Sequence, residues 1–379
     1  MKRWMERHPL MSRVLIDIAL AAAVLLVFAL FHHVLPRQQQ GLGISIPNPY
    51  ATGGSLAAPD EAQPEALLAS GSFTSGVQYD SSGLSARGGG RKGRGRSGGA
   101  SSEKGGSALD GSETDDTMPE EADDTPISEK FPEMYTDTVV ESGSGYTSPN
   151  VSISVSEEHT ADGRVTYYLA DIYLRDVTCF QTALAGNTYG TGFRDSITDM
   201  ARLSSALVAV NGDYYGNTNE GVVIRNGVIY RVNPTNCDVC VLYYDGSMRV
   251  IAGSDFDMQQ AIEDGAWQAW TFGPSLLSGD GSAINSFAST RRIISANPRT
   301  AIGYYEPGHY CLVVVDGRGD SEGISLPELS QLFASLGCRA AYNLDGGNSS
   351  IMVWNNRVIN QPSGGGRESS DALVIREVE

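Results

Sequence analysis

Three short segments in the second half of this 379-residue chain place an aspartate beside a glycine directly after a run of apolar residues. These segments are Asn211-Gly-Asp213, Asp316-Gly-Arg318 and Asp345-Gly-Gly347. An Asp-Gly pair alone is most often an ordinary turn, because glycine tolerates backbone angles that other residues avoid. Three such turns after apolar strands are more informative, since strand ends can meet at one rim of a sheet. We therefore predict a functional site where the three turns converge.

The residue types near these turns favour a ligand that is both sugar-like and anionic. Paired carboxylates can divide into acid and base, or acid and nucleophile, when their surroundings separate their pKa values. Arginines and the backbone N–H groups of glycine turns bind phosphate oxygens. Main-chain hydrogen bonds are the alternative role for these side chains. The converging groups are Asn211, Asp213, Asp316, Arg318, Asp345, Asn348 and Ser349, with Arg299 and Arg367 from loops.

Other chemistries have weaker support in the sequence. Asp and Asn oxygens suit calcium or magnesium, but no regular ligand spacing accompanies them, so we predict no metal site and keep calcium as the alternative. A serine hydrolase is disfavoured, because the folded part has only His159 and His309 and lacks a Gly-x-Ser-x-Gly motif. Cys237-Asp-Val-Cys240 has no second pair for zinc, which leaves a local disulfide or two reduced thiols.

The elements that position these turns are predicted to form one α+β domain over residues 146–379. We expect a mixed, largely β core with a few packed helices, because apolar alternation typical of strands recurs along this region. Two Asn-Gly or Asp-Gly pairs between apolar runs predict tight hairpins. These pairs are Asn226-Gly227 and Asp245-Gly246. Helical spacing of apolar residues predicts three helices. They span residues 197–205, 258–266 and 326–336, whereas residues 180–192 are predicted to be a loop.

The amino terminus is predicted to be a membrane anchor. Basic residues within positions 1–13 precede an apolar run over residues 14–35. That run is about as long as a helix needs to be to cross the hydrocarbon core of a bilayer. The basic flank predicts a cytoplasmic tail at 1–13 and an extracytoplasmic location for the rest of the chain. A cleaved signal peptide is the alternative, but a small-residue cleavage site is lacking after Leu35.

Residues 36–145 are predicted to be a disordered, low-complexity linker. The segment is rich in Gly, Ser, Ala and Pro, with a basic stretch at 87–96 followed by an acidic block. Too few apolar residues are present to offset the entropy lost on ordering. We expect its end, residues 129–146, to lie on the domain as an arm. The formal net charge of −18 disfavours nucleic acid as a partner of the whole chain.

The third turn lies in a segment that resembles a family signature. Asn343-Leu-Asp-Gly-Gly-Asn-Ser-Ser-Ile-Met352 resembles the phosphodiester glycosidase signature, whose usual form is Asn-Leu-Asp-Gly-Gly-Gly-Ser-Ser. Further family landmarks follow the same order along the chain. They are Val210-Asn-Gly-Asp-Tyr-Tyr215, Phe272-Gly-Pro-Ser-Leu276, Pro298-Arg-Thr-Ala-Ile-Gly303, Val315-Asp-Gly-Arg318, and Gln361-Pro-Ser363 with Arg367. Two positions depart from the pattern: Asn348 replaces the third glycine, and Asp213 replaces a residue that is small in many members.

The resemblance implies a hydrolase that releases a sugar from a phosphate-linked acceptor, and the predicted anchor places this hydrolase at the membrane, outside the cytoplasm. Many bacterial members are described as exopolysaccharide biosynthesis proteins, so the expected substrate is a phosphate-linked glycan of the envelope or exopolysaccharide. The alternative is a non-catalytic glycan-binding or polymer-assembly module that uses the same cleft. The stereochemical outcome and the oligomeric state stay open. The expected catalytic residues are Asp345, Asp316 and Asp213, and the expected substrate-binding residues are Asn211, Arg299, Arg318, Asn343, Gly346, Gly347, Ser349 and Arg367.

Overall fold

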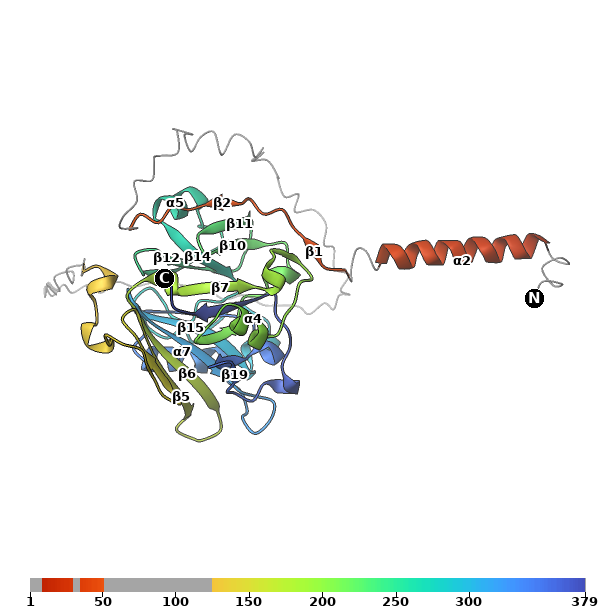
Figure 1. The fold of residues 1–379 in the computed structure, drawn as a ribbon. Helices are drawn as coiled ribbons and strands as arrows, with labels where there is room; N and C mark the ends of the chain where they lie inside the picture. Colours follow the sequence, from red (N-terminus) through yellow and green to blue (C-terminus); the bar gives the residue numbers. More distant parts are fainter. Residues whose placement is uncertain (1–8, 30–34, 51–124, 379) are drawn as a thin grey trace, which may run out of the picture. The chain divides into compact units, whose positions relative to one another are not determined.

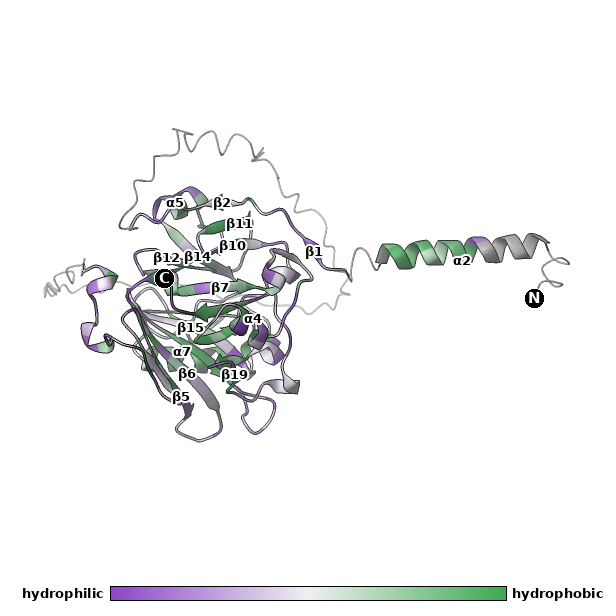
Figure 2. Ribbon diagram, viewed as in Figure 1, coloured by the Kyte–Doolittle hydropathy of each residue, from purple (hydrophilic) through white to green (hydrophobic). Residues whose placement is uncertain are grey.

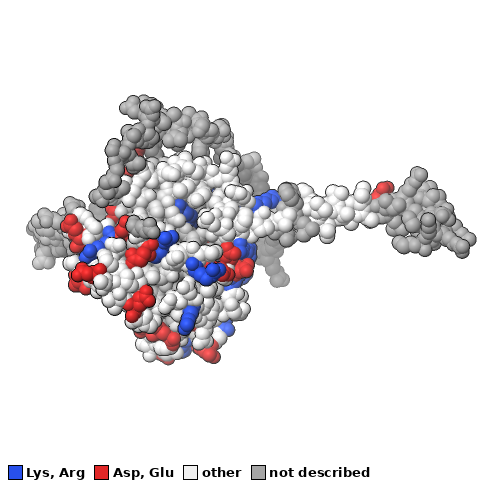
Figure 3. Space-filling model, in the orientation of Figure 1, with Lys and Arg blue, Asp and Glu red and all other residues white. Residues whose placement is uncertain are grey.

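Antiparallel strands make up most of the folded part of the chain (Figure 1). The computed structural model describes residues 9–29, 35–50 and 125–378. Hydrophobic residues are concentrated on the strands, as expected for elements that pack against one another (Figure 2). On the face drawn in Figure 3, acidic residues lie interspersed with basic ones over the domain. The predicted α+β class is confirmed, with sheets dominating and helices few.

The first sheet has six strands in the order β13-β12-β14-β10-β11-β2. Its two predicted hairpins are confirmed: Asn226 and Gly227 join β10 to β11, and Asp245 and Gly246 join β12 to β13. Asn226, Gly227 and Gly246 have positive φ angles, as such tight turns require. In the order of the sheet, the strands are Met248–Ile251, Val239–Tyr243, Ala266–Thr271, Gly221–Arg225, Val228–Asn233 and Ile44–Ser45.

The second sheet has seven strands in the order β17-β15-β16-β6-β5-β4-β3, and the third has five in the order β19-β18-β9-β20-β7. The seven strands are Ala340–Asn343, Arg299–Glu306, His309–Val315, Thr166–Leu174, Val151–His159, Gly145–Thr147 and Val140–Glu141. The five are Arg357–Val358, Met352–Trp354, Val208–Asn211, Asp371–Ile375 and Phe180–Leu184. A short pair, β1 (Arg37–Gln38) with β8 (Gly190–Thr191), completes the described strands.

The continuous apolar runs arise because these strands are buried on both faces. In β16, Leu312 and Val314 belong to the main core between the sheets, whereas Val313 and Val315 pack on the opposite side against helix α7 (Leu326–Ser335). The five-stranded sheet is covered in the same way by helix α4 (Ile197–Leu203). Burial on both faces removes the alternation of apolar and polar residues that marks a half-exposed strand.

Two helix predictions are confirmed and one is shorter than expected. Helices α4 and α7 lie where predicted, and the sequence Ser325-Leu-Pro-Glu328 forms a capping box at the start of α7. Helix α5 spans only Met258–Glu263, because Gly265 has a positive φ and Ala266 already begins β14. A short helix, α6 (Arg291–Ile294), lies in the loop before β15.

The loop predicted at 180–192 is wrong at both ends. Its first part forms strand β7 (Phe180–Leu184), which pairs with β20, and its last part includes β8 (Gly190–Thr191), which pairs with β1. The signal was weak, because Phe180 and the polar Thr182 are the residues that face inward. A half-polar inward face does not show the apolar alternation on which the prediction depends.

The predicted linker, 36–145, is too wide at both ends. Residues 44–45 form the edge strand β2 on β11, and Ile46 is buried in the core. At the other end β3 and β4 extend the seven-stranded sheet, so the expected arm on the domain is confirmed. Each short segment contributes a few apolar or β-branched residues, which the polar composition of the whole region hid. Residues 51–124 of the linker, with the basic stretch at 87–96, lie outside the described residues.

Helix α2 spans Pro9–Ala29, so it overlaps the predicted anchor at 14–35 and begins within the predicted tail at 1–13. Within the part of the chain that the structure describes, no helix meets the combined requirement of length and apolar character for crossing a membrane. The segment 30–34 of the predicted span lies outside the described residues.

Candidate functional site

A cavity of about 730 Å³ lies where several strands of the domain end, a size typical of small-molecule sites. Its wall is formed by the turns after β9, β14, β16 and β17 and by the loop that contains α6. Two of the turns contact each other directly, because Asn211 Nδ2 donates to the Asp345 carbonyl over 2.7 Å. Six predicted site residues line this cavity: Asp213, Arg299, Arg318, Asp345, Gly346 and Gly347.

Asp345 is the carboxylate with the clearest functional environment. Its side chain is only 12% exposed, and its Oδ2 accepts a hydrogen bond from Arg367 Nη2 over 2.6 Å. Burial raises the pKa of Asp345 above its usual value, while Ser349, Arg367 and the Gly346 amide act in the opposite direction. A carboxyl in a cavity wall whose pKa is raised by burial is a candidate for proton transfer.

Arg367 and Ser349 lie against this carboxylate. Ser349 Oγ accepts from Arg367 Nε over 2.9 Å, so the hydroxyl helps to hold the guanidinium against Asp345. The same guanidinium lies 5.6 Å from the centroid of the Tyr214 ring, which is partly exposed at the cavity wall. Neither Arg367 nor Ser349 is among the residues that line the cavity.

Arg299 and the glycine amides are used inside the protein. Arg299 Nε donates to the Ile324 carbonyl over 3.2 Å, and its Nη2 donates to two carbonyls of the α6 loop. Burial, and secondarily the neighbouring Arg318 charge, lowers the pKa of Arg299 to about 10. The Gly346 amide donates to Asp345 Oδ1 and the Gly347 amide to the Pro298 carbonyl. In this arrangement these donors bind acceptors of the protein, and their predicted contacts with a phosphate stay predictions.

Asp316 is not among the residues that line the cavity. Its Oδ1 accepts from Asn360 Nδ2 over 2.8 Å and its Oδ2 from the Gln361 amide over 2.9 Å. Burial raises the pKa of Asp316, and these two hydrogen bonds partly offset the rise. The structure thus gives the second turn an anchoring contact for residues 360–361 and does not place its carboxylate beside Asp345 in the wall.

Asn211 and Asn343 are buried behind the wall rather than exposed to a ligand. Besides its contact with Asp345, Asn211 accepts from Thr300 Oγ1 over 2.7 Å. Asn343 Nδ2 donates to the Gly273 carbonyl over 2.8 Å, which ties β17 to the turn after β14. Both amides fix the backbone of the turns, so the predicted contacts with sugar hydroxyls do not match their positions.

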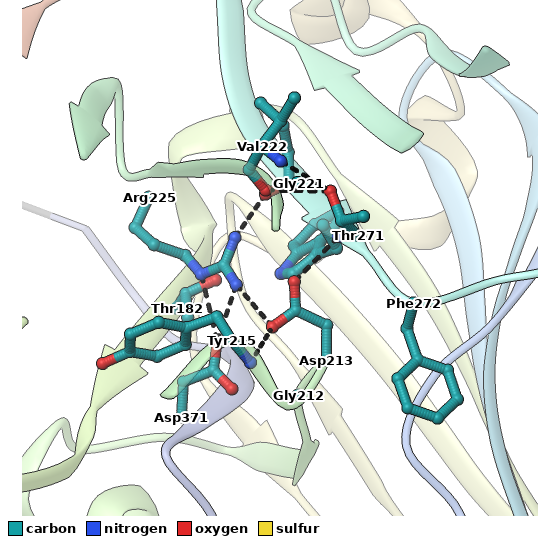
Figure 4. Close-up of polar contacts among 12 residues, drawn as sticks. Thr182, Gly212, Asp213, Tyr215, Gly221, Val222, Arg225, Thr271, Phe272 and Asp371 are labelled. Carbon is teal, nitrogen blue, oxygen red and sulfur yellow. Dashed lines mark hydrogen bonds and ion pairs between the residues drawn. The ribbon is translucent and has the colours of Figure 1, made fainter. Parts of the chain in front are cut away.

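Asp213 belongs to a buried ion-pair network that the sequence did not indicate (Figure 4). Its Oδ1 lies 2.8 Å from Arg225 Nη2, and the same Nη2 lies 2.9 Å from Asp371 Oδ2. Asp213 Oδ2 also accepts from the Thr271 amide over 2.8 Å, which links the turn after β9 to the end of β14. Arg225 precedes an Asn-Gly turn and reads as a solvent-facing hairpin residue, so the only available signal was a charge at the end of an apolar strand.

The donor set gives no sign of a metal centre. Among the described ranges, no group of three or more His, Cys, Asp or Glu side chains is arranged to hold a metal ion. Cys237 is exposed and lines the cavity, Cys240 is buried, and both are free thiols. The disulfide alternative for this Cys-x-x-Cys segment is therefore not what the structure shows.

Fold and site together define an α+β, largely antiparallel domain with acids and arginines around one cavity at its strand ends. Residues 204–376 match the family model described as phosphodiester glycosidase. The resemblance predicted from the sequence is confirmed over this region.

Among curated proteins, the chain is 31% identical over 195 residues to the SPbeta prophage-derived uncharacterized protein YomE of Bacillus subtilis (strain 168), covering 49% of this chain and 30% of that protein. It is 37% identical over 78 residues to N-acetylglucosamine-1-phosphodiester alpha-N-acetylglucosaminidase of Bos taurus, covering 21% of this chain and 14% of that protein. The chain therefore spans less than a third of the length of these two relatives.

Solved structures similar to this chain include two of low sequence identity. The catalytic domain of zebrafish N-acetylglucosamine-1-phosphodiester alpha-N-acetylglucosaminidase, auto-inhibited by its pro-peptide, has a TM-score of 0.48 at 22% identity over 60% of this chain and 83% of that chain. A hypothetical protein from Synechocystis has a TM-score of 0.47 at 13% identity over 60% of this chain and 63% of that chain.

Proposed function

We propose that this domain hydrolyses a glycosyl-1-phosphodiester bond within the cavity, on a phosphate-linked glycan of an envelope or exopolysaccharide. The observation that carries the proposal is the placement of the Asp345 carboxyl and the Arg318 guanidinium around one Gly346-Gly347 turn at the same wall. The family match and the activity named for the Bos taurus relative support the reaction class.

In the proposed reaction, water supplies the oxygen that joins the anomeric carbon, and the bond from that carbon to the phosphate oxygen breaks. The products are a free sugar and a phosphate monoester. Asp345 is the proton-transfer or nucleophilic group. Both Asp213 and Asp345 lie in the wall, but Asp213 is paired with the buried Arg225, whereas the partner of Asp345, Arg367, is partly exposed. Arg318 offsets the negative charge on the phosphate as the bond breaks, which is where electrostatic stabilisation is most effective.

Asp213 has a positioning role in this proposal. Because its carboxylate is bound to Arg225 and to the Thr271 amide, it holds two wall segments together rather than reacting with a substrate. Tyr214, with its partly exposed ring, supplies an apolar face on which a sugar can stack.

Asp345→Asn tests the catalytic assignment. The full chain is assayed for sugar release from a synthetic sugar-1-phosphodiester, with and without a chelator, and ligand binding is measured by calorimetry. Loss of a positioned proton-transfer group lowers kcat by about 10²–10⁴-fold, while the isosteric amide preserves the cavity. Asp280→Asn, at an exposed turn, is the matched control and should keep full activity.

Two results would count against the proposal. Unchanged turnover by Asp345→Asn would remove Asp345 from the chemistry. Binding of the phosphodiester by the wild-type protein without any release of sugar would instead favour the non-catalytic glycan-binding module.

The location is proposed from the sequence alone. The basic residues within 1–13 and the apolar run over 14–35 support a single-pass anchor with the domain outside the cytoplasm. Membrane fractionation of cells, followed by protease treatment of intact spheroplasts, tests it. Recovery of the chain in the soluble cytoplasmic fraction would refute this location.

A further inference from the structure

Arg318 is held at the cavity wall by two neutral side chains. Its Nη1 donates to Asn348 Oδ1 over 3.1 Å, and its Nη2 donates to Asn297 Oδ1 over 2.8 Å. Within the described part of the chain, Arg318 forms no ion pair. Arg225 and Arg367 differ, since each is paired with an aspartate. Arg318 is thus an oriented cation whose charge is not cancelled by a carboxylate.

The two asparagines approach Arg318 from different parts of the fold. Asn297 lies in the loop after α6, where its Nδ2 donates to the Ser295 carbonyl over 2.9 Å. Asn348 lies on the turn that follows Asp345, within the short 3-10 helix Gly347–Ser349. The side-chain amide of each asparagine therefore fixes the guanidinium relative to a different wall of the cavity.

The backbone supports the same orientation. Arg318 has a φ of 63°, a left-handed conformation that costs free energy in a non-glycine residue. A Cβ added at Gly347 would lie 3.3 Å from Arg318 Nη2, so the guanidinium rests directly on this glycine. Gly347 also has a φ of 69°, which a larger residue adopts only with strain.

Asparagine and aspartate have nearly the same shape, but they differ in what they do to a cation. An amide oxygen accepts a hydrogen bond and leaves the positive charge free, whereas a carboxylate accepts it and neutralises the charge. The usual glycine of the family signature at position 348 would supply no acceptor. The side chain at position 348 therefore decides both the orientation of the Arg318 guanidinium and whether its charge is neutralised.

We infer that Asn348 and Asn297 are positioning residues that aim Arg318 at the phosphate of the substrate while leaving its charge available. This inference rests on the proposed function, and it assigns the preference for a phosphodiester over a neutral glycoside to the three residues together. Asn348, the departure from the family signature, is thereby given a specific task in this chain.

Asn348→Gly and Asn348→Asp test this in the full chain. Two quantities are measured: the Kd for inorganic phosphate by calorimetry, and kcat and KM for a sugar-1-phosphodiester. Asn348→Gly removes one hydrogen bond to the cation and should weaken phosphate binding about fivefold. Asn348→Asp keeps the acceptor but pairs with Arg318 and repels phosphate, so it should weaken binding about tenfold or more, mainly through KM.

The control is Asn356→Asp, which adds the same charge at an exposed position of the β18–β19 hairpin. It should leave phosphate affinity unchanged. If Asn348 only shapes its turn, Asn348→Asp will bind phosphate like the wild type and only the melting temperature of Asn348→Gly will change, which overturns the inference. Failure of the wild type to bind phosphate overturns it as well.

The readouts separate this inference from the proposed function. If the wild type binds phosphate without turnover, and the variants weaken that binding as expected, the hydrolase assignment fails and the role of Asn348 stands. If the wild type hydrolyses the diester and both variants match it, only the positioning role is refuted.

Discussion

Arg225→Met should destabilise the folded protein by about 3–5 kcal/mol at neutral pH, because it leaves two buried carboxylates without their shared cation. Arg225 is 1% exposed, with its Nε 3.0 Å from Asp371 Oδ2 and its Nη2 2.8 Å from Asp213 Oδ1. Methionine fills part of the same volume, so the loss is chiefly electrostatic. The expected change is a large part of the roughly 5–15 kcal/mol that typically separates folded from unfolded proteins.

The effect should depend on pH in a defined direction. Burial is the main cause that raises the pKa of Asp371, whereas Arg225 lowers it, so removing Arg225 raises this pKa further. Below the ordinary pKa of Asp, about 4, the Asp371 carboxyl of the variant is protonated in both the folded and the unfolded state, so the loss of Arg225 costs little stability. As the pH rises from there towards neutrality, Asp371 releases its proton in the unfolded chain but retains it in the folded chain. Stability is therefore lost with rising pH.

Urea unfolding of the full chain at pH 5 and pH 7.5, followed by fluorescence, measures this difference. The matched control is Arg231→Met, which removes a buried arginine that donates to backbone carbonyls such as that of Thr218 and, among the described residues, forms no ion pair with a carboxylate. Its cost should be about 1–3 kcal/mol and nearly independent of pH. A cost of less than 1 kcal/mol for Arg225→Met at pH 7.5, or equal costs for it at both pH values, would refute the reasoning.

Three further changes have specific expected outcomes. Gly346→Ala places a Cβ 2.9 Å from the Pro298 carbonyl, so it should destabilise by about 1–3 kcal/mol; denaturant midpoints check this, and a neutral result would contradict the contact. Arg367→Ala removes a group that lowers the pKa of Asp345, so the limb of the pH–rate profile that reports Asp345 should move to higher pH. An unchanged profile would contradict the influence of Arg367 on the pKa of Asp345. Ser325→Ala removes the N-cap of α7 and should cost about 1 kcal/mol, as judged by urea unfolding.

Much of the fold was predictable because its signals are local. The Asn226-Gly227 turn requires positive φ at both positions, and the spacing of apolar residues in α7 follows from the helical repeat. Strand β7 was missed because its inward face includes a threonine. The edge strand β2 was missed because two apolar residues inside a low-complexity region carry little statistical weight.

The candidate site was only partly predictable from the sequence. Sequence places Asp213, Asp316 and Asp345 in equivalent turns, but it does not say which partners each carboxylate meets. In the folded chain, Asp213 forms an ion pair with Arg225, and Asp316 accepts a hydrogen bond from Asn360. Asp345 lies in the cavity wall. These partners are distant in the chain, so no local pattern links them.

The sequence by itself indicated the family resemblance, the α+β class and the residues around the Asp345 turn, because glycine turns and apolar runs constrain the backbone within a few residues. Tertiary structure decided which charges are satisfied inside the protein and which remain available. Arg299 and Arg318 show the difference: both are arginines at the same cavity. Arg299 donates to three backbone carbonyls inside the protein. Arg318 is held by the neutral side chains of two asparagines. Burying a charge requires partners, and only the folded chain brings such partners together.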